Sequence, residues 1–292
     1  MPRFSANLGF LWKELTLPEA IRAAGRAGFA AVECHWPYDV PVEAVLEALV
    51  ETGLLMLGIN TRQGHNGPAD FGVTAMPGRE EEARRYIDEA VSYAAAIGCR
   101  NINAMAGRTG RTPAAESAFR ENLAYACAAA APYRVNIVVE PINQRDAPGY
   151  HVSLVEQALE TIDAVGAPNL RLMLDCYHTQ IMQGDLIRRL EAVRPYLGHI
   201  QFAGVPLRGE PDEGEINYVN VFSAIDQMGW DGYVGAEYRP RGSTEEGLSW
   251  LIPFRAAIIE ERNRVPVSDN RAGLDPNRHP IPSTGADPGS ET

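Results

Sequence analysis

The chain has 292 residues, with 38 acidic and 26 basic side chains, a formal net charge of −12 and 45% hydrophobic residues. This length fits either two small domains or one α/β barrel of about 250 residues with an appended tail. The charge argues against a general nucleic-acid binder, which needs Lys and Arg to neutralise phosphates. No apolar run approaches the roughly 18 residues of a membrane helix.

The N-terminal residues and the cysteines indicate the compartment. Residues 1–7 lack the basic and then apolar pattern of a secretory signal. The four cysteines are scattered and show no Cys-x-x-Cys spacing, which is typical of buried thiols in a reducing environment. We therefore expect a cytoplasmic protein with no membrane partner.

Short apolar or β-branched runs alternate along the chain with segments of helical periodicity. The predicted strands are Phe4–Leu8, Ala31–Cys34, Leu54–Ile59, Asn101–Ala104, Asn136–Glu140, Leu172–Asp175, His199–Phe202 and Tyr233–Glu237. The predicted helices are Leu17–Ala27, Val42–Thr52, Arg79–Ile97, Pro113–Ala131, Ser153–Val165, Gln180–Val193, Asn220–Met228 and Glu245–Arg262. Eight strand–helix pairs predict a (β/α)₈ TIM barrel over residues 1–262. A doubly wound sheet is disfavoured because no Gly-x-Gly-x-x-Gly turn follows the first strand.

The C-terminal residues 263–292 differ in composition from the predicted barrel. They are rich in Pro, Gly, Ser and Asp and contain very little apolar material. Such a segment cannot bury enough surface to offset the entropy of ordering it. We expect a disordered, flexible tail.

Polar residues lie at or next to the ends of the last four predicted strands. Glu140, Asp175 and Glu237 follow apolar runs directly, and Gln201 stands within the seventh strand, at intervals of 35, 26 and 36 residues. These intervals match one strand–helix unit, so the four side chains are expected at the same mouth of the barrel, where barrel enzymes place their chemistry.

Three neighbouring carboxylates would repel one another unless they take up protons or bind a cation. A set of oxygen ligands from Glu, Asp, Gln and Glu suits the hard ions Mg²⁺ and Mn²⁺, whereas zinc prefers His and Cys. The strand ends therefore predict a divalent metal site made of Glu140, Asp175, Gln201 and Glu237.

Five segments of the sequence closely resemble hydroxypyruvate isomerases and the related 2-oxo-tetronate isomerases, within the xylose-isomerase-like barrel superfamily. The resemblance extends over about residues 1–262. The segments are Glu140–Tyr150, Leu174–His178, Gly198–Ala203, Glu210–Tyr218 and Gly235–Pro240. Gln201 is informative, because many sugar epimerases of the superfamily have His at that position.

The resemblance implies isomerisation of a small hydroxy-oxo acid, from hydroxypyruvate to 2-hydroxy-3-oxopropanoate (tartronate semialdehyde). In the family, the residues matching Glu140 and Glu237 transfer the proton, and those matching Glu140, Asp175, Gln201 and Glu237 hold the metal. The chemistry agrees, because moving a carbonyl to the adjacent carbon needs a base, an enediolate stabilised by positive charge, and an acid.

Further candidates surround the predicted mouth and would bind the substrate. His178 lies three residues after Asp175, and His65 lies in the loop after the third strand. A substrate carboxylate needs a cation, for which we name Arg108, after the fourth strand, and Arg208, in the long loop after the seventh. That loop, 205–218, is long enough to act as a lid.

Several alternatives stay open from the sequence. A 2-oxo-tetronate isomerase, a sugar epimerase or a dehydratase would use the same barrel, and a homo-oligomer is compatible with it. A non-catalytic ligand-binding barrel is disfavoured because both Glu140 and Glu237 are present. A barrel endonuclease is disfavoured because it needs a His-rich zinc cluster, and the acidic chain has six histidines.

Overall fold

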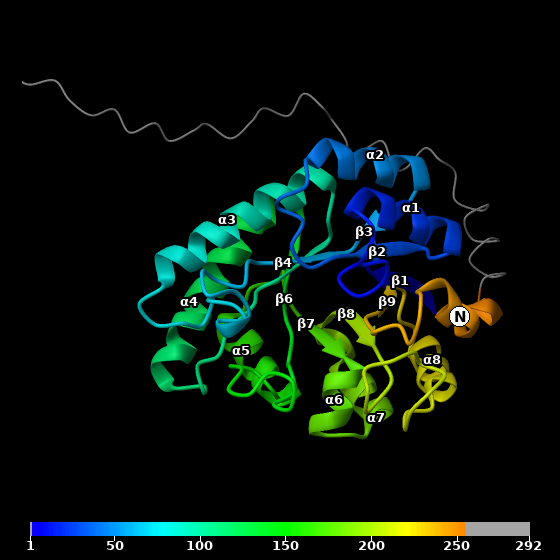
Figure 1. The fold of residues 1–292 in the computed structure, drawn as a ribbon. Helices are drawn as coiled ribbons and strands as arrows, with labels where there is room; N and C mark the ends of the chain where they lie inside the picture. The colour runs from blue at the N-terminus through cyan, green and yellow to red at the C-terminus, as the bar shows by residue number, and fades with distance from the viewer. Residues whose placement is uncertain (1, 255–292) are drawn as a thin grey trace, which may run out of the picture.

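A computed structural model describes residues 2–254 and shows a nearly closed barrel of parallel strands surrounded by helices (Figure 1). The strands form one sheet in the order β3-β2-β1-β9-β8-β7-β6-β5-β4. Their bounds are β1 Arg3–Asn7, β2 Ala31–Glu33, β3 Leu55–Met56, β4 Gly58–Asn60, β5 Asn101–Asn103, β6 Asn136–Val139, β7 Leu170–Asp175, β8 Leu197–Phe202 and β9 Tyr233–Ala236. The predicted TIM barrel is confirmed.

The barrel closes at the third predicted strand, which the structure divides into β3 and β4. β3 pairs with β2 and β4 pairs with β5, and only Leu57 separates them. Backbone hydrogen bonds continue across the seam, from Leu57 N–H to Val32 O at 2.8 Å and from Cys34 N–H to Gly58 O at 3.0 Å. The strand is divided because its pairing changes at Leu57, from β2 before this residue to β5 after it.

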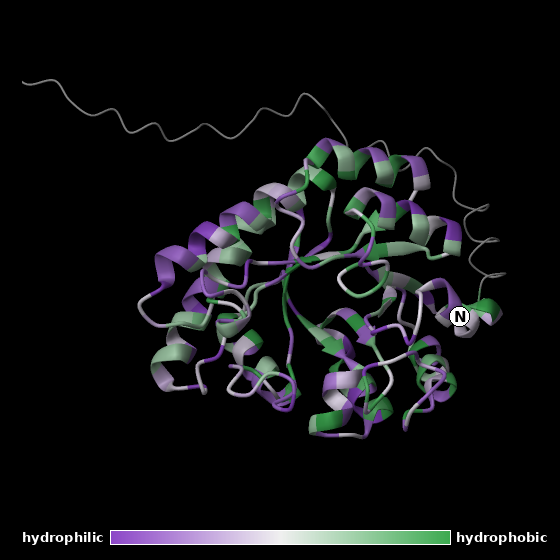
Figure 2. Cartoon of the chain, viewed as in Figure 1, coloured by the Kyte–Doolittle hydropathy of each residue, from purple (hydrophilic) through white to green (hydrophobic). Residues whose placement is uncertain are grey.

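The helices alternate with the strands, except that β3 and β4 are consecutive and α6 and α7 are consecutive, and they mostly begin and end where their capping residues predict. Their bounds are α1 Leu17–Ala27, α2 Val42–Thr52, α3 Glu80–Ile97, α4 Pro113–Ala130, α5 Val155–Val165, α6 Cys176–Met182, α7 Leu186–Val193 and α8 Tyr218–Gln227. Gly53 and Gly98 end α2 and α3 in the left-handed conformation, with φ of 65° and 66°, which glycine adopts without steric cost. The helices carry both polar and apolar stretches along their surfaces (Figure 2), as expected for helices that cover a barrel.

Two predicted helices differ from the structure. The single helix Gln180–Val193 is wrong: α6 ends at Met182, and α7 starts at Leu186. Gly184 and Asp185 take left-handed φ values of 66° and 53° between them, which an α-helix cannot include. In the predicted helix Glu245–Arg262, Glu245–Leu251 is a 3₁₀ helix. Its remainder beyond residue 254, the domain boundary at 262 and the tail 263–292 lie outside the described residues.

The core lies between the sheet and the helices, and polar side chains occupy the barrel interior near the carboxyl ends of the strands. Ser5, Asn7, Glu33, Asn103 and Gln201 are all at least 97% buried. All four cysteines are buried free thiols. Within residues 2–254, no helix combines the length and the apolar character needed to cross a membrane.

Candidate active site

The four polar residues predicted at the strand ends lie next to one another because strands β6, β7, β8 and β9 are neighbours in the sheet. Glu140 follows β6, Asp175 ends β7, Gln201 lies in β8 and Glu237 follows β9. Asp175 pairs in register with Gln201. All four are buried, with exposed fractions of 7% or less.

Five side chains lie close together at the mouth of the barrel, and we call them the mouth cluster: Glu140, Asp175, His178, Arg208 and Glu237. One side-chain atom each from Glu140, Asp175, His178 and Glu237 lies within 4.8 Å of the others. Arg208 Nη2 lies 2.6 Å from Glu237 Oε2 and 3.6 Å from Asp175 Oδ2. The structure thus brings together three predicted metal ligands and two predicted substrate-binding residues.

Glu237 is surrounded by donors and cations. Asn7 Nδ2 donates to its Oε1 at 2.9 Å, and His35 Nε2 lies 3.2 Å from the same oxygen. Burial raises the pKa of Glu237, but Arg208 and His35 outweigh burial and lower the pKa to about 2. Glu237 is therefore a carboxylate in the metal-free protein.

Glu140 and Asp175 have the opposite surroundings. Asn103 Nδ2 donates to Glu140 Oε2 at 2.8 Å, yet burial and the charges of Glu237 and Asp175 raise the pKa of Glu140 well above its ordinary value. Burial raises the pKa of Asp175 to about 7, although Arg208 opposes the shift. The two glutamates at this mouth therefore differ in proton affinity.

His178 directs its Nε2 toward the cluster. Its Nδ1 accepts from the backbone N–H of Asn143 at 3.3 Å and lies 2.6 Å from the Asn143 side-chain amide. Burial and the nearby Arg208 lower the pKa of His178 to about 3, so the ring is neutral and its proton lies on Nε2. Nε2 lies 3.7 Å from Glu140 Oε1 and 3.6 Å from Asp175 Oδ2, which suits a group that polarises an oxygen in the site.

Arg208 reaches the cluster from the long loop between β8 and α8. Its guanidinium lies between two aromatic rings, 4.7 Å from the Phe10 ring centre and 4.9 Å from that of Tyr177. The backbone N–H of Arg239 donates to Arg208 O at 2.7 Å, and Arg145 donates to Pro206 O at 3.0 Å. The loop predicted as a lid is therefore attached to neighbouring segments and already places Arg208 in the site.

The donor set fits a divalent cation. The mouth cluster holds three carboxyl groups against one guanidinium, and burial makes this excess of negative charge costly. Two buried oxygens nearby, Asp175 Oδ2 and Gln201 Oε1, have no hydrogen-bond partner. Unpartnered carboxylate and amide oxygens are ligands that Mg²⁺ and Mn²⁺ accept.

Two predicted substrate-binding residues lie in other surroundings. His65, whose side chain is 64% exposed, contacts Arg79 and Glu82. With Asp70, these residues form a second charged group, which we call the α3 clasp: His65, Asp70, Arg79 and Glu82. Arg108 donates to Pro148 O at 2.6 Å and lies 5.6 Å from the Phe71 ring centre. Neither residue joins the mouth cluster.

The sequence interpretation missed two residues that contact the glutamates, Asn7 and Asn103. Each is the last residue of its strand, β1 and β5, which is the same signal that identified Asp175. Asparagine at a strand end is more often read as a turn residue, because its side chain favours turns. His35, the third contact, follows β2 and lies 3.2 Å from Glu237 Oε1.

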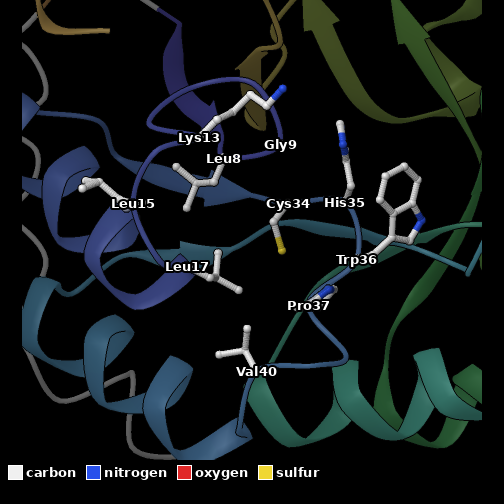
Figure 3. A pocket seen from close by; sticks show the side chains of 11 residues that line it. Leu8, Gly9, Lys13, Leu15, Leu17, Cys34, His35, Trp36, Pro37 and Val40 are labelled. Carbon is white, nitrogen blue, oxygen red and sulfur yellow. The ribbon is translucent and has the colours of Figure 1, made fainter. Parts of the chain in front are cut away.

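A cavity of about 300 Å³ lies beside the mouth cluster, between the loops that follow β1 and β2 (Figure 3). His35 lines it and also contacts Glu237, so the cavity adjoins the site. Leu8 and Trp36 contribute apolar wall, and Lys13 contributes a cation at the edge.

Known proteins resemble this chain over most of its length. The family model of the xylose isomerase-like TIM barrel matches residues 21–254. A human protein named putative hydroxypyruvate isomerase is 43% identical over 86% of this chain and 95% of its own length. The 2-oxo-tetronate isomerase of Pectobacterium atrosepticum is 39% identical over 87% of this chain and 98% of its own.

A solved structure is also similar. The crystal structure titled as an AP endonuclease of family 2 from Brucella melitensis is 41% identical, with a TM-score of 0.84, and the match covers 87% of this chain and all of that one. The barrel, the matched family model and the relatives along nearly their full length lead to one conclusion: the chain belongs to the xylose isomerase-like TIM barrel family.

Proposed function

We propose that this protein is an isomerase of a small hydroxy-oxo acid and converts hydroxypyruvate to tartronate semialdehyde. In that reaction the carbonyl moves from C2 to C3 of a three-carbon acid. One proton leaves C3, an enediolate forms across C2 and C3, and one proton arrives at C2, while the oxygen on C3 loses its hydroxyl proton and the oxygen on C2 gains one. The reaction needs no redox cofactor, because the substrate and the product are isomers.

The observation that carries the proposal is the pair of buried glutamates, Glu140 and Glu237, in the same cluster but with opposite pKa shifts. Proton removal from one carbon and return to its neighbour require two groups that can each accept or donate a proton, and two carboxyl groups in different surroundings can divide these tasks. We propose that these two residues transfer the proton.

The remaining residues of the site bind and polarise the substrate in this proposal. Arg208 supplies the cation for the substrate carboxylate, and the Nε2–H of His178 donates to a substrate oxygen. Glu140, Asp175, Gln201 and Glu237 would hold Mg²⁺ or Mn²⁺, whose positive charge stabilises the enediolate. The roles first predicted for His65 and Arg108 gain no support from their positions outside the cluster.

A 2-oxo-tetronate isomerase is the second candidate. The relatives with that name are nearly as similar as those named hydroxypyruvate isomerase. An endonuclease has less support, because the mouth cluster contains one histidine among three carboxyl groups, whereas zinc favours His and Cys.

The proposal is tested with purified protein, Mg²⁺ or Mn²⁺, and each of the two acids in D₂O, followed by proton NMR. We expect the aldehyde proton of tartronate semialdehyde to appear, with deuterium incorporated at C2 where solvent exchanges with the transferred proton. Turnover of 2-oxo-tetronate alone would transfer the assignment to the second candidate. Turnover of neither acid would contradict the proposal. A cytoplasmic location, a homo-oligomeric state and the absence of a nucleic-acid partner stay predictions.

A further inference from the structure

A buried carboxylate below the mouth cluster, Glu33, has no part in the reaction described above. Glu33 ends β2 and is 3% exposed. Its Oε1 accepts from Ser5 Oγ at 3.0 Å, and its Oε2 lies 3.1 Å from His199 Nε2. β2 and β8 are separated in the sheet by β1 and β9, so Glu33 reaches His199 through the barrel interior.

The barrel reserves space for this carboxylate. Gly235 in β9 faces it, and a Cβ added there would lie 2.0 Å from Glu33 Oε1 and 3.0 Å from His199 Nε2. Any larger residue at position 235 would displace the carboxylate, since real Cβ contacts are never that short. The fold leaves out a side chain at position 235 to make room for a buried carboxylate, and this arrangement needs a functional or structural explanation.

The third partner of Glu33 supplies that reason. Gln201 Nε2 donates to Glu33 Oε2 at 2.8 Å. A glutamine amide has one donating and one accepting end, and a carboxylate only accepts, so Glu33 fixes which end faces it. The accepting end, Oε1, is then directed away from Glu33, and this oxygen is buried without a hydrogen-bond partner.

The unpartnered oxygen belongs to a residue at the height of the metal site. Gln201 pairs in register with Asp175, whose Oδ2 is also buried and without a hydrogen bond. Neighbouring residues of a parallel pair project to the same side of the sheet. Glu33 therefore controls the orientation of an amide that stands beside a candidate metal ligand.

We propose that Glu33 is a positioning residue that holds the Gln201 amide with its oxygen presented to the divalent metal at the mouth of the barrel. This inference rests on the proposed function, because it assumes that the site holds a metal. A competing arrangement is a single water on Gln201 Oε1, since a cavity of about 20 Å³ is lined by Glu33, Asn103 and Gln201.

The test measures Mn²⁺ affinity by isothermal titration calorimetry, with metal-stripped protein and no substrate. Glu33→Gln keeps the shape of the side chain but lets the Gln201 amide turn, so the Kd should rise about 10- to 100-fold, as for other residues that orient metal ligands. Glu33→Asp keeps the charge but shortens the reach to Gln201, and should show a similar loss. If circular dichroism shows that Glu33→Gln is unfolded, the Mn²⁺ Kd of Glu33→Asp decides the question.

A matched control and a double-mutant cycle separate positioning from general damage. Ser5→Ala removes a hydrogen bond from the other oxygen of the same carboxylate and should change the Kd less than about threefold. In a Gln201→Met background, Glu33→Gln should likewise have almost no further effect, because Glu33 acts through Gln201.

Each outcome has a distinct meaning. Wild-type affinity in Glu33→Gln, as the bound-water arrangement would give, overturns the inference while leaving the proposed function standing. If Glu33→Gln raises the Mn²⁺ Kd equally in the wild-type and the Gln201→Met backgrounds, the inference is also overturned. If the wild-type protein binds neither Mn²⁺ nor Mg²⁺, the metal in the proposed function is refuted and this inference with it.

Discussion

The mouth cluster and the α3 clasp contain the same kinds of side chains, but all the clasp carboxyl groups have lowered pKa values, whereas in the mouth cluster only that of Glu237 is lowered. In the clasp, Arg79 Nη2 lies 2.9 Å from Asp70 Oδ2, and Arg79 Nε lies 2.8 Å from Glu82 Oε2. The pKa of each of these two carboxyl groups is lowered to about 2. In the mouth cluster, by contrast, the pKa values of Glu140 and Asp175 are raised.

The difference comes from burial and from the ratio of charges. Asp70, Arg79 and Glu82 keep 10–19% of their side chains exposed, and one arginine bonds both carboxylates. In the mouth cluster three nearly fully buried carboxyl groups share one arginine, and that arginine lies closest to Glu237. The clasp is thus a structural ion-pair network, whereas the unbalanced charge of the mouth cluster is the feature that fits the proposed divalent cation.

The largest effect should come from neutralising a glutamate of the mouth cluster. We expect Glu140→Gln and Glu237→Gln each to lower kcat by about 10³-fold or more, since each removes a proton-transfer group, with the fold retained. Proton NMR in D₂O measures turnover and circular dichroism monitors the fold. Glu82→Gln is the matched control, and should leave kcat within about threefold of wild type, as substitutions far from a site usually do. Turnover near the wild-type rate in either mouth variant would refute the proton-transfer roles.

Removal of the metal should give the next largest effect. Dialysis against EDTA should lower turnover by about 100-fold or more, because the enediolate then loses the cation that stabilises it, and Mg²⁺ or Mn²⁺ should restore it. The clasp gives the internal comparison: its contribution to the free energy of unfolding should not depend on the metal. Full activity after metal removal would leave the unpartnered oxygens of Asp175 and Gln201 without an explanation.

The two clusters also show what the sequence can and cannot predict. The alternation of strands and helices predicted the barrel, and the spacing of Glu140, Asp175 and Glu237 placed them at one mouth, because parallel strands end at the same edge. Asn7 and Asn103 lie on strands next to those of Glu237 and Glu140, and the sequence shows them at strand ends, where asparagine is more often read as a turn residue. The cross-barrel partners of Glu33 depend on which strands face each other through the interior, and a linear pattern does not contain that information. His65 was assigned to the substrate because it lies in the loop after the third predicted strand. Its contacts with Glu82 and Arg79 arise from packing, which the linear pattern does not show.

A smaller effect should follow from replacing an arginine of the mouth cluster. Arg208→Lys retains a positive charge but loses the planar guanidinium that lies between Phe10 and Tyr177 and the geometry for a carboxylate. We expect kcat/KM to fall about 10- to 100-fold, mainly through a higher KM, because an orienting contact of about 1.4–2.8 kcal/mol is lost. Arg108→Lys is the control, since its guanidinium contacts Pro148 and Phe71. An equal loss in the two variants would show that Arg208 has no special role in binding the acid.

The smallest effect should be one of stability, at the clasp. The carboxyl groups of Asp70 and Glu82 have ordinary pKa values of 3.8 and 4.5 and folded pKa values of about 2. The folded state therefore binds fewer protons than the unfolded state between these values, and the free energy of unfolding that the clasp contributes falls as the pH is lowered from about 4.5 to about 2. Above that range the contribution is complete.

Arg79→Met isolates this contribution, because it removes the cation that lowers both pKa values while keeping an apolar side chain of similar length. Urea unfolding at pH 7 should show a loss on the order of 1 kcal/mol relative to wild type, as for partly exposed ion pairs. The difference should shrink toward zero near pH 2, where both carboxyl groups are becoming protonated in the wild-type protein. Turnover should stay close to wild type, since Arg79 contacts the clasp alone among the charged groups described above. A difference in stability that is the same at both pH values would mean that Arg79 contributes by packing, and the contrast between the two clusters would then rest on burial alone.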